Sequence, residues 1–592
     1  MAMIGLIAAT AAGRGAAERL ALAWPDTRRY EEPAASALPR AFAECDAVVC
    51  FLAVGATVRL LAPLLGGKHS DPGVVCVDEA LRYAVPVVGA HAGGANELAR
   101  RVCLVLGSEA VITTASDAAG CVALDEFGAD LGFALEPGSD LASVGAAILS
   151  GERVTLTVEV PEPAAADAPA AAGRPGWPLP PLPPNVVRAD RAEPGVPAII
   201  VSDRAVPAAG RCAVYRPPSL VVGIGASRGV TAAEVSTLID DALAGAGLSP
   251  RSVRLAATVD RKADEEGLLE AVRRRNWQLA FFPAADLAAV PVPNPSETVR
   301  SATGTPSVAE AAALLAARGP ASPDGHGLVV TKQASARATV AVARVRPRGR
   351  LAVVGIGPGA RDLMTPRSVA ELRRASVIVG LDQYVDQVAD LLRPGTTILA
   401  SGLGREQERA ATAVAEARAG RAVALIGSGD AGIYAMASPA LELADGTVDV
   451  TGVPGVTASL AAAALLGAPL GHDHAVISLS DLHTPWEVIE RRVTAAAEAD
   501  LVVCFYNPAS RGRTWQLRRA LSVLARSRPP GTPVGWVRDA SRPGESVSVA
   551  ALADVDPAGA DMRTLIIVGS SRSRAVAGRM VTPREYRWAG PS

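Results

Sequence analysis

Three glycine-rich strings between residues 351 and 459 constrain the fold of this chain more than any other feature. They read GIGPGARDL, GSGDAGIY and GVPGVTAS, and each follows an apolar run of strand-like composition. After the first string, Thr365-Pro366 predicts a helix with threonine as its N-cap and proline at its first position. Strand, glycine turn and helix in repetition predict an α/β fold with one cleft built mainly from backbone. For any single string, an ordinary sheet turn is the competing interpretation.

The residues of these strings indicate what the cleft binds. None of the strings contains the Lys-Ser/Thr of a phosphate-binding P-loop. Asp430 is the only fixed charge in the second string, and it suits a ribose hydroxyl or a cationic group better than a phosphate. The third string ends in small residues that leave room for a flat ring. The pattern therefore predicts a site for a cofactor that is not held by its phosphates.

Further strings narrow the assignment of this part of the chain. They are GSGDAGIYAMAS, ISLSDLHTPWEVIERRV and CFYNPASRGR. With them, residues 351–586 resemble the tetrapyrrole methylase family, which methylates uroporphyrinogen-derived rings and diphthine precursors with S-adenosylmethionine. Within it, the resemblance is to the group that methylates carbon 17 of precorrin-3B, or of its cobalt counterpart, and contracts the ring. The resemblance implies a two-lobed class III methyltransferase fold, a break between lobes near 467–473, and a homodimer.

The resemblance also implies which residues contact S-adenosylmethionine. The expected cofactor-binding residues are Gly357, Pro358, Ser428, Gly429, Asp430, Ile433, Tyr434, Thr457, Ala458, Tyr506 and Asn507. Methyl transfer needs no protein nucleophile, but ring contraction moves protons and requires an acid or base. The unranked candidates are His472, His474, Asp481, His483 and Tyr384. Thr484 and Glu487 predict a capping box at the start of an amphipathic helix.

Length and composition predict the organisation of the rest of the chain. At 592 residues and about 150 residues per domain, three or four domains are expected. A proline- and alanine-rich tract at 161–184 reads as a linker or mobile loop. The expected parts are an α/β domain at 1–151, a linker and poorly matched middle segment at 152–216, a second small α/β domain at 217–345, and the methylase domain at 346–592.

Charge and apolar patterning exclude several classes of protein. A net charge of −2 gives no basic surface for nucleic acid. The most apolar uncharged stretch, residues 450–471, contains prolines and glycines and does not read as a membrane span. Without a signal sequence at the start of the chain, a cytoplasmic protein is expected. Seven cysteines without a CxxC pair predict free thiols, and the six histidines predict no metal site.

Lysine usage draws attention to the first 350 residues. Of 58 basic residues only three are lysines, at Lys68, Lys262 and Lys332. Either these positions require a compact, deprotonatable ammonium, or the three lysines survive by chance. The string DPGVVCVDEALRYAVPVVGAHAGGANELARR resembles the N-terminal domain of the cobalamin-biosynthesis proteins that open the lactone of cobalt-precorrin-5A and release acetaldehyde. The strings TGTPSVAEAAALLAA and VVTKQASARATVAVAR resemble their C-terminal domain.

Lactone hydrolysis requires a base and a hydrogen-bond donor for the developing oxyanion. From residue type and the matching strings, His91 and Glu97 are candidate bases, and Lys68, Asn96 and Lys262 are candidate donors. Arg228 lies in the loop GIGASRG before a helix capped by Thr231, and this arrangement suits an acetate or propionate. A nucleotide-binding turn is the alternative for that loop. The expected substrate-binding residues are Lys68, Asn96, Arg228 and Lys332.

The sequence thus predicts a bifunctional cobalamin-biosynthesis enzyme, with a ring-opening hydrolase-like half fused to a ring-contracting methyltransferase. Its expected partners are a corrinoid ring and other enzymes of that biosynthesis, and cobalt enters only as part of the ring. One alternative makes residues 1–345 a carrier that binds unstable intermediates without chemistry. Another lets the methylase act on a different carbon or on a translation factor.

Overall fold

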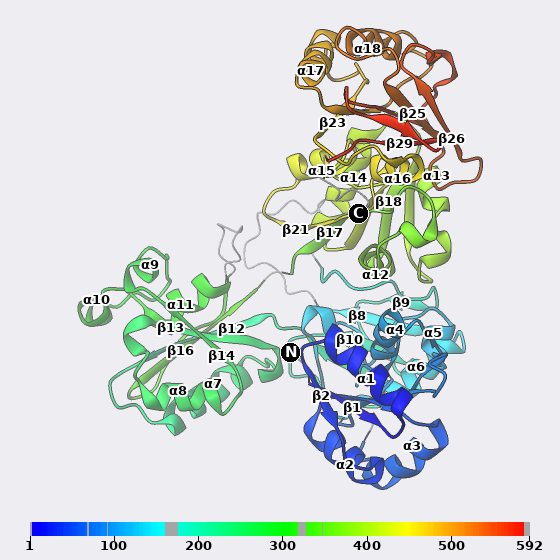
Figure 1. Cartoon of the computed structure of the whole chain (residues 1–592). Coiled ribbons are helices and arrows are strands. Elements are labelled where there is room, and N and C mark those ends of the chain that lie inside the picture. The colour runs from blue at the N-terminus through cyan, green and yellow to red at the C-terminus, as the bar shows by residue number, and fades with distance from the viewer. Residues whose placement is uncertain are drawn as a thin grey trace. The chain divides into compact units, whose positions relative to one another are not determined.

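The computed structural model describes residues 3–67, 70–90, 93–159, 176–317, 327–345, 347–584 and 586. The chain divides into two compact units. Unit 1 comprises Met1–Ala170, Pro180–Arg346 and Arg393–Gly395, and unit 2 comprises Ala171–Leu179, Pro347–Leu392 and Thr396–Ser592. Both units are built from sheets covered by helices, so the predicted α/β class is confirmed (Figure 1).

Six strands and four helices form the first sheet layer of unit 1. The strands are β1 Ile4–Ala8, β2 Thr27–Tyr30, β3 Ala47–Phe51, β4 Gly73–Val77, β5 Tyr83–Val88 and β6 Glu109–Ala110, and the helices are α1 Ala11–Ala23, α2 Ala34–Glu44, α3 Val54–Leu61 and α4 Ala95–Leu106. The order is β2-β1-β3-β4-β5-β6, parallel except between β4 and β5. Helices α1 and α4 cover one face and α2 and α3 the other, so the central strands are continuous apolar runs.

A second sheet lies mostly within residues 152–216. Its strands are β7 Ala134–Leu135, β8 Val154–Val158, β9 Val186–Arg188, β10 Ala198–Val201 and β11 Cys212–Arg216, in the order β7-β11-β10-β8-β9. The sequence predicted a proline- and alanine-rich linker and a poorly matched middle segment here, and the structure places strands on both sides of the proline- and alanine-rich tract. The strands are short, and β8 and β9 pair across the proline- and alanine-rich tract, so no single window carries their signal. Of that tract, residues 161–175 lie outside the described residues, and 176–184 contain no helix or strand.

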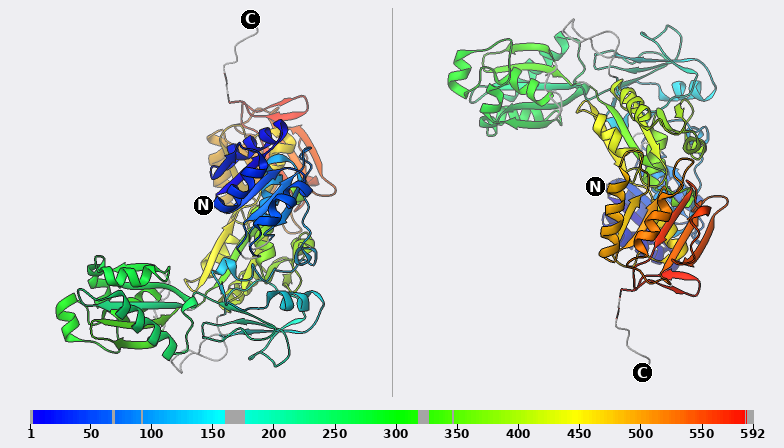
Figure 2. Two further views of the ribbon diagram at one scale, coloured as in Figure 1. Left: turned by 90° about the horizontal axis from the view of Figure 1, so that it is seen from below. Right: turned by 90° about the horizontal axis from the view of Figure 1, so that it is seen from above.

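The third sheet of unit 1 has five strands. They are β12 Leu220–Ala226, β13 Val253–Val259, β14 Gln278–Phe282, β15 Leu328–Ala334 and β16 Ala338–Arg344, in the order β14-β13-β12-β16-β15. Helices α7 Ala232–Gly245 and α8 Glu266–Arg273 pack on one face, and α11 Val308–Ala317 packs on the other (Figures 1 and 2). Thr231 caps α7 as predicted, because its hydroxyl accepts from the Glu234 amide at 3.2 Å.

Unit 2 begins with a lobe built on an all-parallel sheet. Its strands are β17 Gly349–Gly355, β18 Val377–Leu381, β19 Thr397–Ser401, β20 Ala422–Gly427 and β21 Val448–Val453, in the order β19-β18-β20-β17-β21. Helices α14 Glu406–Arg418 and α15 Ala437–Leu443 pack on one face, and α12 Pro366–Arg374 and α13 Asp382–Asp386 on the other. Thr365 caps α12 as predicted, accepting from the Ser368 amide at 3.1 Å.

The second lobe of unit 2 combines a mixed five-stranded sheet with a small three-stranded one. The strands are β22 Gly467–Ala468, β23 His474–Ser478, β24 Val502–Tyr506, β25 Pro533–Arg538, β26 Ser546–Ala551, β27 Thr564–Val568, β28 Arg574–Val576 and β29 Arg579–Val581. The orders are β23-β24-β27-β25-β26 and β22-β29-β28. Helices α17 Trp486–Glu498 and α18 Gln516–Leu524 cover one face, and α16 Ala458–Leu466 covers the other.

The capping box predicted at the start of α17 is wrong. The helix begins one residue later than expected, with Pro485 as its N-cap residue and without a side-chain capping hydrogen bond. Thr484 therefore lies outside the helix, too early for its hydroxyl to cap the first free amides.

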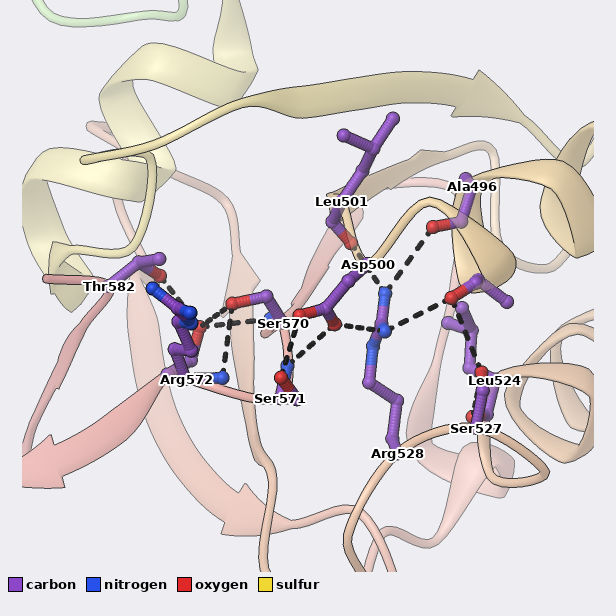
Figure 3. A network of polar contacts seen from close by, with 12 residues as sticks. Ala496, Asp500, Leu501, Leu524, Ser527, Arg528, Ser570, Ser571, Arg572 and Thr582 are labelled. Carbon is purple, nitrogen blue, oxygen red and sulfur yellow. Dashed lines mark hydrogen bonds and ion pairs between the residues drawn. The ribbon is translucent and has the colours of Figure 1, made fainter. Parts of the chain in front are cut away.

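Arg528, whose side chain is 1% exposed, anchors the end of α17 (Figure 3). Its guanidinium donates to the carbonyl oxygens of Ala497 and Leu501 at 3.1 and 2.8 Å and pairs with the carboxylate of Asp500. Asp500 in turn accepts from the amide and hydroxyl of Ser571 at 2.8 and 2.6 Å. Burial acts to raise the pKa of Asp500, but the Ser571 hydrogen bonds and the Arg528 charge outweigh it and hold that pKa below its usual value.

Candidate functional site

The three glycine-rich loops meet at one edge of the first lobe of unit 2. Strands β20, β17 and β21 are neighbours and run parallel, so their loops leave the sheet side by side. Gly357 and Gly429 exchange backbone hydrogen bonds of 3.1 and 2.7 Å, which join the first loop to the second. Asp430 joins the second loop to the third, because its carboxylate accepts from the Gly455 amide at 3.0 Å.

The loops approach so closely that two glycines have no room for a side chain. A Cβ added to Gly455 would lie 2.1 Å from the Gly429 carbonyl oxygen. A Cβ added to Gly355 would lie 2.7 Å from that same oxygen. Both contacts are with backbone, which cannot rotate away, so the convergence of the loops depends on glycine itself.

A cavity of about 370 Å³ opens against these loops, between the first and second lobes of unit 2. Its volume is in the range typical of small-molecule sites. Nine of the eleven residues predicted to bind the cofactor line it, namely Pro358, Ser428, Gly429, Ile433, Tyr434, Thr457, Ala458, Tyr506 and Asn507. Gly357 and Asp430 are not among the described residues that line the cavity, and both hold the loops together instead.

Tyr506, at the end of β24, organises the wall of the cavity. Its hydroxyl accepts from the Ser459 amide at 2.9 Å, at the start of α16, and lies 2.6 Å from the Thr457 hydroxyl. The next residue, Asn507, has a left-handed φ of 51°, consistent with the predicted exclusion of αR before proline. Its side-chain amide donates to the Ser478 hydroxyl at 3.0 Å.

Tyr434 crosses from the first lobe to the second. Its hydroxyl donates to the Val476 carbonyl at 2.9 Å and accepts from the Ser478 amide at 3.1 Å. Both groups belong to β23, an edge strand, so the hydroxyl occupies positions that a further strand would use. The Tyr434 ring lies 5.4 Å from the Tyr506 ring, and burial raises the pKa of its hydroxyl.

The sequence reasoning missed several charged residues of this cavity. Arg409, Arg542, Arg563, Glu406 and Asp539 all line it. Arginine is so abundant in this chain that no single arginine stands out. The segments that carry these five residues, 406–409 and 539–563, are also far apart in the sequence. Of the acid or base candidates, Tyr384 lines the cavity. Asp481 is exposed, accepts from the Gln516 side chain at 2.9 Å and is not among the described residues that line the cavity.

Comparison with known proteins decides the family. Residues 350–556 match the model of the tetrapyrrole (corrin/porphyrin) methylases. Over 239 residues the chain is 48% identical to a Salmonella typhimurium protein described as a probable cobalt-factor III C(17)-methyltransferase, a match that covers 40% of this chain and 99% of that protein. The chain belongs to the tetrapyrrole methylase family.

The same part of the chain is similar to two further proteins. A precorrin-3B C(17)-methyltransferase of Sinorhizobium is 42% identical to the methylase part over 252 residues, covering 41% of this chain and 98% of that protein. The crystal structure of the methyltransferase CobJ shares 40% identity, with a TM-score of 0.38, and covers 40% of this chain and all of that one. Ahead of the methylase, residues 36–117 match the cobalamin synthesis G N-terminal model and residues 220–343 match the cobalamin synthesis G C-terminus model. The methylase is therefore joined to cobalamin synthesis G segments in a protein of cobalamin biosynthesis.

The candidate residues ahead of the methylase are less concentrated than those of the methylase cavity. Asn96 is buried on α4, and its amide donates to the Thr114 hydroxyl and the Asp117 carboxylate at 3.2 and 3.0 Å. The side-chain oxygen of Asn96 is buried without a hydrogen-bond partner. Glu97 is exposed and pairs with Arg100 at 3.5 Å. Lys68 and His91 lie outside the described residues.

The third sheet of unit 1 carries the remaining candidates. The Lys262 ammonium lies 3.5 Å from the Glu265 carboxylate, which also accepts from the Gly229 amide at 2.8 Å. The Arg228 side chain, next to Gly229, is exposed. Lys332 donates from Nζ to the Asn294 carbonyl at 3.0 Å. The structure thus brings Lys262 and the Arg228 loop together through Glu265.

The described residues contain no helix that is long and apolar enough to cross a membrane. Within the same ranges, no three His, Cys, Asp or Glu side chains are grouped so that they could hold a metal ion. All seven cysteines are free thiols, and five of them are buried, whereas Cys103 and Cys121 are partly exposed.

Proposed function

We propose that the methylase part of this chain transfers a methyl group from S-adenosylmethionine to carbon 17 of precorrin-3B or cobalt-factor III, with contraction of the ring. The observation that carries the proposal is the cavity at which the three glycine loops converge, lined by nine of the residues expected to bind the cofactor. The relatives described as C(17)-methyltransferases align over this same part of the chain.

The residues of the cavity fit S-adenosylmethionine. The wall combines Cβ-free backbone at Gly429 with the neutral side chains of Ser428, Thr457 and Ile433 and the aromatic ring of Tyr506. S-adenosylmethionine supplies a methyl group already activated on sulfur, so the protein needs no nucleophile. The loops and Tyr506 orient the two reactants, and alignment of this kind is worth on the order of 7–11 kcal/mol in favourable cases. Tyr384, which lines the cavity, is the residue we assign to proton movement in the contraction.

The test is a mass-resolved assay of the full chain with S-adenosylmethionine and either precorrin-3B or cobalt-factor III. A one-methyl mass gain on one ring and not the other would support the proposal and identify the substrate. Tight binding of both rings without a mass change would reject methyl transfer to them and favour a carrier or another substrate.

We further propose that residues 1–345 open the lactone of cobalt-precorrin-5A and release acetaldehyde, with Lys262 as donor to the developing oxyanion. The matches to the cobalamin synthesis G models support this proposal, as does the Lys262–Glu265–Gly229 arrangement. Acetaldehyde release by the full chain is the measurement. Lys262→Arg is expected to lower the rate and Arg261→Lys, next to it, to leave it unchanged. Ring binding without acetaldehyde would instead indicate a carrier.

We propose that the chain works as three parts, residues 1–151, 217–345 and 346–592. In the sequence, most strands of the second sheet lie between the first two parts. We also propose a homodimer formed through the methylase part, which rests on the family resemblance. Light scattering of the full chain, and of a chain truncated after residue 345, tests whether the methylase part is needed for dimerisation.

A further inference from the structure

Arg409 is a buried cation in the methylase cavity whose contacts are all neutral. The residue is 5% exposed, on α14, and lines the cavity. Its Nε donates to the Ser401 hydroxyl at 3.0 Å, its Nη2 to the Gly402 carbonyl at 2.9 Å, and its Nη1 lies 3.8 Å from the Met436 sulfur. No carboxylate of the described residues pairs with it.

Arg542 is a second cavity-lining cation of the same kind. It is half-buried, and it reaches the first and second glycine loops. Its Nε donates to the Pro358 carbonyl at 2.6 Å and its Nη2 to the Ser428 hydroxyl at 2.8 Å. Within the described ranges it too has no carboxylate partner.

Other charges near the cavity do not neutralise this pair. Of the two acidic residues on the wall, Asp539 lies 3.4 Å from Arg563, and Glu406 accepts from the Gly404 amide at 3.3 Å. Elsewhere in unit 2, Arg528 pairs with Asp500 and Arg350 with Glu371, whereas buried Arg513 donates, among the described residues, only to neutral atoms. A buried charge without a counter-charge is costly, and a ligand that brings a carboxylate removes that cost.

We propose that Arg409 and Arg542 form a carboxylate-binding subsite that fixes the orientation of a ligand in the methylase cavity. The inference rests on the proposed function, and it adds a role for two residues outside the predicted cofactor set. Guanidinium groups bind carboxylates through paired, charge-assisted hydrogen bonds. The carboxylate belongs either to an acid side chain of the ring or to the amino-acid end of the cofactor.

The experiment is a set of binding titrations on the full chain, with Arg409→Gln, Arg542→Gln and a matched control, Arg418→Gln. Arg418 lies on the same helix as Arg409, is 46% exposed and pairs with Asp445 outside the cavity. The probes are uroporphyrin III, which carries only ring carboxylates, S-adenosylhomocysteine, and 5′-methylthioadenosine, which lacks the amino-acid end. We expect Arg409→Gln and Arg542→Gln to weaken one carboxylate probe by about 10- to 100-fold. Arg418→Gln should leave all affinities unchanged.

The pattern of loss identifies the source of the carboxylate. Weaker binding of uroporphyrin III with unchanged S-adenosylhomocysteine assigns the subsite to the ring. Weaker S-adenosylhomocysteine with unchanged 5′-methylthioadenosine assigns it to the cofactor. Wild-type affinity of both variants for both carboxylate probes overturns the subsite while leaving the proposed function intact.

Two other outcomes are a variant that does not fold and a wild-type chain that binds neither carboxylate probe. If Arg409→Gln does not fold, the same titrations are made with two other variants. These are Arg409→Lys, which keeps the charge, and Arg542→Gln, at a more exposed position. If the wild-type chain binds neither uroporphyrin III nor S-adenosylhomocysteine, the proposed function fails, and the subsite fails with it.

Discussion

Two sheet edges in this molecule share a topology but are held together by different chemistry. At the methylase edge, loops that follow neighbouring parallel strands contact each other backbone to backbone, through Gly357, Gly429 and Gly455. At the edge of the third sheet in unit 1, the Glu265 side chain of the loop after β13 accepts from the Gly229 amide of the loop after β12, and it also pairs with Lys262 of its own loop. The first junction leaves no room for a Cβ at Gly355 or Gly455, although the Asp430 carboxylate also joins its second and third loops, whereas the second junction depends on a carboxylate alone. Substitutions of shape and of charge should therefore act selectively on the two edges.

The largest effect is expected from Gly455→Ala in the methylase. Its Cβ would lie 2.1 Å from the Gly429 carbonyl oxygen, and we expect a loss of roughly 3 kcal/mol in stability of this unit and no measurable S-adenosylhomocysteine binding. Thermal unfolding and titration calorimetry measure both. The control is Gly452→Ala, where nothing lies within 4 Å of the added Cβ. Wild-type binding by Gly455→Ala would remove the basis of the comparison.

A smaller effect is expected from Glu265→Gln at the other edge. The carboxylate is buried, accepts from the Gly229 amide and faces Lys262, so its neutral replacement should destabilise this loop by about 2 kcal/mol. Hydrogen exchange of residues 227–230 in the full chain is the measurement. Glu266→Gln is the control, because Glu266 is 76% exposed. Equal exchange in both variants would contradict a charge-held junction.

Tyr506→Phe tests the side-chain contribution to the methylase edge. The change removes one acceptor for the Ser459 amide and one partner of Thr457. We expect S-adenosylhomocysteine affinity to fall about tenfold while the fold persists, as for the loss of one good hydrogen bond. An affinity equal to that of the wild type would mean that backbone alone sets this wall. Tyr83→Phe, at an exposed site in unit 1, is the control.

The smallest effect concerns pH. The folded-state pKa of Asp500 is lowered, so its contribution to stability is full above the unfolded-state pKa, about 3.9, and is lost as pH falls through the folded value. Asp500 is 39% exposed, so solvent screening limits the contribution to at most about 1 kcal/mol. Asp500→Asn should therefore shift unfolding temperature less between pH 6 and pH 3 than the wild type does. An identical pH profile would contradict this reading.

The parts of the site that could be predicted are those that depend on neighbouring residues in the sequence. Caps at Thr231 and Thr365 are local, and the glycine strings mark the ends of strands that the sheet then places side by side. The contact of Tyr434 with β23 spans 42 residues and leaves no local signal. Arg409 and Arg542 were missed because arginine dominates the basic residues of this chain.

The hydroxyl of Tyr434 also affects the tendency of the protein to aggregate. An unpaired edge strand is a template on which a second chain can add, and proteins usually blunt such edges with charge, proline or a covering segment. Tyr434 covers β23 with a single side chain that cannot itself continue the sheet. Any movement that withdraws this ring from the cavity wall uncovers the edge of β23. Ligands that hold the ring in place should thus reduce aggregation of the protein in concentrated solutions.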